Sequence, residues 1–217
     1  SLVGSEMCIR DRQGTVGKEI LEDDIDYDVI FVPVGGGGLI SGIAAYVKAI
    51  RPNVKIIGVE PEDAASMTRS LENNHRVKLE EVGTFTDGCA VRQVGRETFR
   101  LSSEIVDKMI TASVDEICAA IKDIFEDTRV IAEPAGALSM AGLKNYIALE
   151  GCTGKTLVAI NCGANINFDR LRHITERAEI GEKRESLFAV AIPEKPGSFR
   201  RFCKIIGKSS ITEFNYR

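Results

Sequence analysis

Residues 28–49 read DVIFVPVGGGGLISGIAAYVKA, and this stretch decides the fold. Val29–Val32 form an apolar, β-branched run, which is typical of a buried strand. Four glycines follow, and after them apolar residues recur at Leu39, Ile43 and Val47, on one face of a helix. The stretch therefore predicts a strand, a glycine-rich loop and a helix in succession.

The segments that follow extend this pattern. Pro52 ends the helix, and Val54–Glu60 is typical of a second buried strand, which closes a β-α-β unit with parallel strands. Val114–Val130 has apolar residues at helical spacing, preceded by a capping box of Ser113 and Glu116. Two further elements are predicted, a helix that starts at Pro134 and a central strand at Lys155–Cys162. The predicted fold class is α/β, an open parallel sheet flanked by helices.

Composition narrows the class of partner. The 217 residues are 44% hydrophobic and 28% charged, with a net charge of -4 and no block of like charges, which disfavours nucleic acid as a partner. No apolar run approaches the roughly 20 residues of a membrane span, and the first residues lack the features of a signal peptide. The six cysteines are scattered singly, without the spacing of a zinc site. We therefore expect a cytoplasmic protein with reduced thiols and a small-molecule substrate.

The glycine loop is the strongest chemical signal. Consecutive glycines let several backbone N–H groups converge on one point, and the N-terminus of the following helix adds partial positive charge, so a phosphate fits there. The alternative is a tight turn, which does not require four adjacent glycines. The spacing matches neither GxGxxG nor GxxxxGK[ST], which disfavours dinucleotides and nucleoside triphosphates.

A second candidate site follows the predicted strand at Lys155–Cys162. In open α/β sheets, ligands lie beyond the carboxyl ends of the strands, so Cys162 and Asn165 are candidate site residues. The alternative is a buried cysteine and an asparagine in a turn.

Five motifs together resemble the threonine deaminase family, within the tryptophan-synthase-like fold of pyridoxal-phosphate enzymes. They are Gly35-Gly36-Gly37-Gly38-Leu39, Gly58-Val59-Glu60-Pro61, Asp87-Gly88-Cys89-Ala90-Val91, Glu133-Pro134-Ala135-Gly136-Ala137 and Cys162-Gly163-Ala164-Asn165-Ile166-Asn167-Phe168. The resemblance covers Gln13 to Arg217. It implies pyridoxal 5'-phosphate as cofactor and, in the whole enzyme, deamination of threonine to 2-oxobutyrate and ammonia on the route to isoleucine.

The resemblance also implies roles for single residues. The cofactor phosphate is expected on the amides of Gly35, Gly36, Gly37, Gly38 and Leu39, and Cys162 is expected to face the pyridine nitrogen. Glu133 matches a carboxylate near the pocket floor, although it could instead cap the helix that starts at Pro134. Some relatives bind a cation after the second strand, but Ser66 stands where they have an acid, so we predict no metal.

The predicted domain order is a non-native leader at residues 1–12, the C-terminal part of a catalytic domain at 13–180 and a truncated ACT-like regulatory domain at 186–217, after a linker at 181–185. For the last unit we predict strands at Leu187–Ile192 and Ile211–Tyr216 around a helix at Ser198–Ile206. The family's Schiff-base lysine lies far upstream of the glycine loop, and only 34 residues precede Gly35 here, so we expect no catalytic residue in this chain.

The ACT-like segment implies a feedback-regulated enzyme with isoleucine and valine as effectors, and the family implies a homotetramer. Two alternatives stay open at this point. One is a catabolic serine or threonine dehydratase, against which the ACT-like segment argues. The other is a non-catalytic, amino-acid-sensing protein, in which the phosphate loop and the ACT-like segment bind ligands without chemistry.

Overall fold

The computed structural model describes residues 2–215, with side chains from residue 12 onward. The chain divides into two compact units, one ending at Glu185 and the other beginning at Ser186. None of the described helices is long and apolar enough to cross a membrane.

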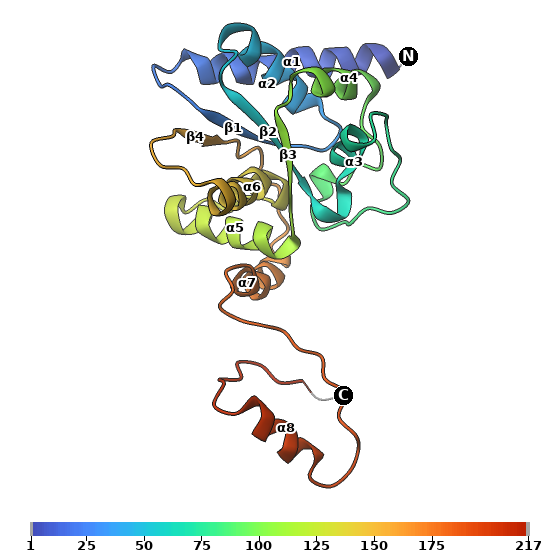
Figure 1. The fold of residues 1–217 in the computed structure, drawn as a ribbon, viewed down its shortest axis with the longest axis vertical. Coiled ribbons are helices and arrows are strands. Elements are labelled where there is room, and N and C mark those ends of the chain that lie inside the picture. Colours follow the sequence, from blue (N-terminus) through green and yellow to red (C-terminus); the bar gives the residue numbers. More distant parts are fainter. Residues whose placement is uncertain (1, 216–217) are drawn as a thin grey trace. The chain divides into compact units, whose positions relative to one another are not determined.

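The first unit is built on a parallel sheet of four strands (Figure 1). In chain order the strands are β1 (Val29–Pro33), β2 (Lys55–Pro61), β3 (Lys108–Ala112) and β4 (Leu157–Ala159). Their order in the sheet is β3-β2-β1-β4, and each pairing is parallel. The predicted α/β class and the parallel β-α-β unit are therefore confirmed.

Helices cover both faces of this sheet (Figure 1). The helices are α1 (Leu2–Glu22), α2 (Gly38–Ile50), α3 (Ser66–Glu72), α4 (Arg96–Ile105), α5 (Val114–Thr128), α6 (Pro134–Glu150) and α7 (Arg170–Gly181), with short 3-10 turns η1 (Glu62–Ala64) and η2 (Asp87–Cys89). Figure 1 places α1, α2 and α4 on one side of the strands and α5 and α6 on the other. α1 continues without a break through the predicted boundary between residues 12 and 13.

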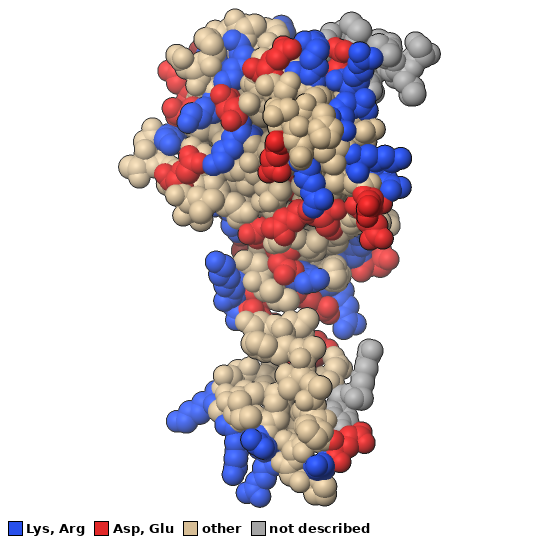
Figure 2. Space-filling model, turned by 45° about the vertical axis from the view of Figure 1, so that its right-hand side comes forward, with Lys and Arg blue, Asp and Glu red and all other residues tan. Residues whose placement is uncertain are grey.

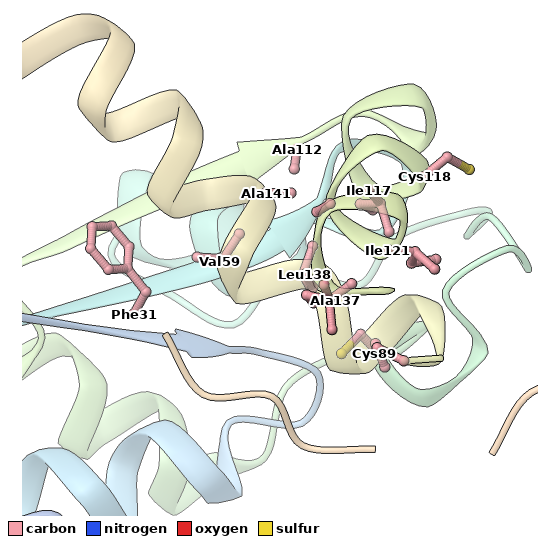
Figure 3. Packing of buried hydrophobic residues seen from close by; sticks show 14 of the residues in the cluster. Phe31, Val59, Cys89, Ala112, Ile117, Cys118, Ile121, Ala137, Leu138 and Ala141 are labelled. Atoms are coloured by element: carbon pink, nitrogen blue, oxygen red, sulfur yellow. The ribbon is translucent and has the colours of Figure 1, made fainter. Parts of the chain in front are cut away.

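Two apolar clusters hold the layers together. Side chains alternate across a strand, so Phe31 packs with α5 and α6 while its neighbours Ile30 and Val32 pack with α2. All five residues of β1 are buried, as expected for a strand covered on both faces. Figure 3 shows Phe31 and Val59 on the strands, facing the small and branched side chains of α5 and α6. This double cover fixes the end of β1, where the glycine loop begins.

Gly142 marks a close approach of α6 to the sheet, and its replacement gives a test of the packing. A Cβ at Gly142 would lie 2.4 Å from Cγ2 and 2.6 Å from Cγ1 of the fully buried Val59. We expect Gly142→Ala to lower the free energy of unfolding by roughly 1–3 kcal/mol through overpacking, measured from the urea midpoint. The matched control is Gly14→Ala in α1, where the nearest atom would be at 3.6 Å. An unchanged midpoint for Gly142→Ala would contradict this close contact.

Helix starts follow the sequence signals closely. At α5, the Ser113 side chain accepts a hydrogen bond from the Glu116 amide, and the Glu116 carboxylate accepts one from the Ser113 amide. The predicted capping box is thus confirmed. α6 begins at Pro134, as predicted.

The fourth strand differs from its prediction. The apolar run at Lys155–Cys162 predicts a central strand, but β4 covers only Leu157–Ala159 and lies at the edge of the sheet, paired with β1 alone. Its residues are half-buried. An apolar run indicates a strand but does not indicate how many strands pair with it, and for this reason the predicted central position was wrong.

The second unit contains one helix, α8 (Ser198–Ile206), whose bounds match the prediction. The strands predicted at Leu187–Ile192 and Ile211–Tyr216 are wrong over the described residues, which form no strand there. Tyr216 itself lies outside the described residues. A strand requires a neighbour for its backbone hydrogen bonds, and neither segment has one within residues 186–215. The apolar side chains of Leu187 and Phe188 are consequently about 80% exposed.

Candidate functional site

The glycine loop joins the end of β1 to the first turn of α2. Gly37 precedes the helix with φ +87° and ψ 3°, a left-handed conformation that favours glycine. The first intrahelical hydrogen bond runs from the Ser41 amide to the Gly37 carbonyl at 3.1 Å. The amides before Ser41 therefore precede the helical ladder and are available to a ligand. The positive end of the helix dipole lies at the same place, so an anion is favoured there.

A cavity of about 320 Å³ opens above this loop. It is lined by Gln13, Pro33, Gly35, Gly36, Gly37, Gly38, Leu39, Gly88, Cys89, Glu133, Ala135 and Cys162. The seven cofactor-binding residues that the family resemblance implies thus meet at one cavity, although they come from three separate segments of the chain. Its volume falls in the range of small-molecule sites. No lysine of the described residues lines it.

The structure also separates one candidate from the others. Asn165 is exposed and does not line the cavity. Ser139 on α6 donates a hydrogen bond to the Ile160 carbonyl at 2.6 Å, just beyond β4. This bond joins α6 to the residue just after β4, two positions before Cys162, whereas Asn165 lies further along the chain.

Cys162 is held as a neutral thiol. Its Sγ donates to the Ala135 carbonyl at 3.6 Å. Partial burial raises the pKa of the Cys162 thiol, and the negative charge of Glu133 raises it further. The sulfur therefore keeps its proton at neutral pH and presents no charge to the cavity.

Glu133 lies beside Cys162 and does not cap its helix with its side chain. It occupies the N-cap position of α6, but the carboxylate makes no cap hydrogen bond. Its backbone N–H donates to the Gly163 carbonyl at 3.0 Å. A Cβ at Gly163 would lie 1.9 Å from Glu133 Oε1, so the carboxylate rests directly over Gly163. The sequence allows Glu133 to be a helix cap or a carboxylate at the pocket floor, and this arrangement favours the pocket floor.

The 3-10 turn η2 forms a wall of the cavity that sequence reasoning missed. A Cβ at Gly35 would lie 3.2 Å from Cys89 Cα and 3.3 Å from the Gly88 carbonyl oxygen, so this turn packs closely against the glycine loop. From the sequence, the motif Asp87–Val91 stands out only as part of the family resemblance. The signal that could have found it is a pair of small residues, Gly88 and Cys89, in a loop between buried segments.

The buried thiols give a second test. Burial raises the pKa of both Cys89 and Cys118 to about 12. Only the thiolate is alkylated, and at pH 8 it amounts to roughly one part in 10⁴ for such groups. We expect iodoacetamide to leave both residues unmodified in the native protein while it labels the exposed Cys203, as followed by peptide mass mapping. Labelling of Cys118 as fast as Cys203 would contradict its burial.

A buried carboxylate lies behind the site. Glu60, at the end of β2, is fully buried, and its two oxygens accept hydrogen bonds from the amides of Met67 and Thr68, at 2.7 and 2.8 Å, and from the Thr68 hydroxyl at 2.7 Å. These donors begin α3 and thereby fix Met67, which packs under Gly37. Within the described residues, no cluster of three or more His, Cys, Asp or Glu side chains could hold a metal ion.

The comparison with known proteins identifies this arrangement. The family model of pyridoxal-phosphate dependent enzymes matches residues 4–163, which include the glycine loop, Glu133 and Cys162. The chain belongs to this family. A second model, the C-terminal regulatory domain of threonine dehydratase, matches residues 176–217.

Individual relatives agree with both matches. The chain is 56% identical to "L-threonine dehydratase biosynthetic IlvA" of Burkholderia multivorans, over 94% of this chain and 41% of the relative. It is 52% identical to the protein of that name from Escherichia coli, over 94% and 40%. The solved processed form of threonine deaminase isoform 2 from Solanum lycopersicum superposes with a TM-score of 0.75 at 49% identity, over 76% of this chain and 48% of that one. The chain thus spans about two fifths of the length of the curated relatives it matches.

On the face shown in Figure 2, Lys and Arg side chains are interspersed with Asp and Glu over much of the first unit, and Asp and Glu gather in a band across its lower part. Several charges of the first unit are paired across elements, as in Lys122 with Glu179 and Glu182.

Proposed function

We propose that this chain is part of a biosynthetic threonine ammonia-lyase, which converts L-threonine to 2-oxobutyrate and ammonia with pyridoxal phosphate as cofactor. The observation that carries the proposal is the meeting of the glycine loop, Glu133 and Cys162 at one cavity, in a chain 56% identical to a biosynthetic threonine dehydratase. In this proposal, residues 13–180 belong to the catalytic domain and residues 186–217 begin the regulatory domain.

The loop fits the phosphate of the cofactor. A Cβ at Gly36 would meet nothing within 4 Å, so open space lies beside this residue. The amides of Gly35 to Leu39 and the dipole of α2 would hold a phosphate dianion there. Because the peptide groups are fixed by β1 and α2, they are oriented before the cofactor arrives.

Pyridoxal phosphate, when bound, supplies an electron sink that stabilises negative charge on the α-carbon of the amino-acid substrate. Cys162 would face the pyridine nitrogen as a neutral group, because its raised pKa keeps the proton on Sγ. A carboxylate at this position would keep the ring protonated, whereas a thiol leaves it largely neutral, which suits elimination of the β-hydroxyl.

Glu133 would form the floor of the pocket. Its carboxylate lies over Gly163, and its negative charge maintains the neutral state of the neighbouring thiol. The proposal assigns the Schiff-base lysine and the grip on the substrate carboxylate to residues outside this chain, because no lysine of the described residues lines the cavity.

Regulation forms the second part of the proposal. The match of residues 176–217 to the regulatory-domain model supports control by a small molecule. We assign isoleucine and valine as the effectors, a homotetramer as the assembly and the cytoplasm as the location. This regulatory segment also disfavours the catabolic alternative.

The test uses the full-length gene product that contains this chain, purified with and without pyridoxal phosphate. We expect 2-oxobutyrate from threonine only when the cofactor is present, and a lower rate when isoleucine is added. Turnover of serine without threonine would instead indicate a serine dehydratase. Failure to bind the cofactor would leave a non-catalytic, ligand-sensing protein.

A further inference from the structure

Thr98 touches the glycine loop from outside the cavity. It lies on the first turn of α4 and is only 3% exposed. Its Oγ1 donates a hydrogen bond to the Gly36 carbonyl at 2.7 Å, and the Gly95 amide donates to the same oxygen at 3.3 Å. Two donors from the start of α4 therefore hold one carbonyl of the loop.

Holding this carbonyl also orients the next amide. Among the described residues all peptide bonds are trans, and in a planar trans peptide the C=O and the following N–H point in opposite directions. The Gly36 carbonyl points toward α4, so the Gly37 N–H points away from α4. Gly36 and Gly37 both line the cavity, so the Gly37 N–H is a candidate donor to a ligand bound there.

Packing adds to the hydrogen bond. A Cβ at Gly37 would lie 2.9 Å from Thr98 Cβ and 2.6 Å from Met67 Cε, so these two side chains pack directly beneath the glycine. A run of four glycines is intrinsically flexible, and ordering it opposes binding. Thr98 limits that freedom before a ligand binds.

We propose that Thr98 is a positioning residue that orients the Gly37 amide for the cofactor phosphate and so raises phosphate affinity. The inference rests on the proposed function for the identity of the ligand. Thr98 does not line the cavity and contacts only the glycine loop there, so we expect its effect to be confined to the phosphate group. Loss of the hydroxyl should therefore weaken binding of pyridoxal phosphate and leave binding of pyridoxal, which lacks the phosphate, unchanged.

The experiment compares Thr98→Val, which removes the hydroxyl at nearly constant volume, with Thr98→Ser, which keeps it. Dissociation constants for pyridoxal phosphate and for pyridoxal are measured on the cofactor-free, full-length protein by fluorescence titration. We expect Thr98→Val to weaken pyridoxal phosphate binding roughly 10-fold, with pyridoxal binding unchanged and Thr98→Ser close to the original protein.

Ser102 provides a matched control on the same helix. It is 1% exposed, and its hydroxyl makes no hydrogen bond with any described residue. Ser102→Ala should leave both dissociation constants unchanged. Equal weakening of both ligands by Thr98→Val would indicate general damage and overturn the inference, as would no weakening at all. If the original protein bound neither ligand, the proposed function itself would fail.

Discussion

Gly37→Ala is expected to weaken pyridoxal phosphate binding roughly 100-fold, corresponding to about 3 kcal/mol. An alanine at φ +87° costs about 1–2 kcal/mol. Its Cβ would also lie 2.6 Å from Met67 Cε and 2.9 Å from Thr98 Cβ. The free loop relaxes only partly from this conformation, and binding must then restore it, so the strain lowers both the stability of the cofactor-free protein and the affinity for the cofactor. Equilibrium titration of the cofactor-free protein measures the change.

Gly36→Ala is the control that distinguishes backbone strain at Gly37 from a general sensitivity of the loop to substitution. Gly36 has no positive φ, and a Cβ there would meet nothing within 4 Å. Gly36→Ala should therefore leave the thermal midpoint of the cofactor-free protein unchanged, whereas Gly37→Ala should lower it. Equal midpoints for the two variants, with unchanged affinity for Gly37→Ala, would show that the left-handed conformation is not required.

The sequence was sufficient for the parts of the fold in which local pattern and burial coincide. β1 is a continuous apolar run and β2 is apolar from Ile56 to Val59, and the sheet buries both of these stretches. The capping box at Ser113 and the proline at the start of α6 are local hydrogen-bonding and dihedral signals, so they mark helix ends without tertiary information.

Pairing partners could not be predicted in the same way. The β4 run was correctly assigned as a strand but not as an edge, because edge position depends on which segments lie beside it. The apolar segments at Leu187 and Ile211 have strand-like composition, yet they form no strand over the described residues because no neighbour is present. β-propensity describes a surface that packs well, and it does not supply the neighbour.

In the candidate site, too, some residues could be predicted from local sequence and others could not. The glycine loop could be predicted from backbone chemistry alone, because four consecutive glycines at a strand-to-helix junction are more than a tight turn requires. Cys162 could be placed near the site from its position after a predicted strand, but its role and that of Glu133 required the family resemblance, since single residues carry no periodic pattern. Thr98 was not found, because its contact with Gly36 joins residues 62 positions apart.

Gly136→Ala is the second substitution expected to have a large effect, because it pushes apart the two segments that carry Glu133 and Cys162. A Cβ at Gly136 would lie 2.3 Å from the Gly163 carbonyl oxygen and 3.0 Å from its nitrogen. Both obstacles are backbone atoms, so neither can rotate away. We expect a loss of roughly 1–3 kcal/mol in the free energy of unfolding from overpacking, although alanine favours a helix by up to about 1 kcal/mol over glycine.

The same displacement of α6 should also lower the affinity for the cofactor. When α6 moves away from Gly163, the hydrogen bond from the Glu133 amide to the Gly163 carbonyl lengthens, and the Cys162 thiol separates from the Ala135 carbonyl. We therefore expect Gly136→Ala to weaken the binding of pyridoxal as well as of pyridoxal phosphate, unlike Thr98→Val, because the change lies at Cys162 and Glu133 and not at the phosphate loop.

Ser139→Ala is the control, since it removes a hydrogen bond between α6 and the segment after β4 without adding volume. It should cost about 1 kcal/mol and leave pyridoxal affinity nearly unchanged. Retained affinity for both ligands in Gly136→Ala would show that the cavity tolerates this displacement and that Cys162 and Glu133 contribute little to binding.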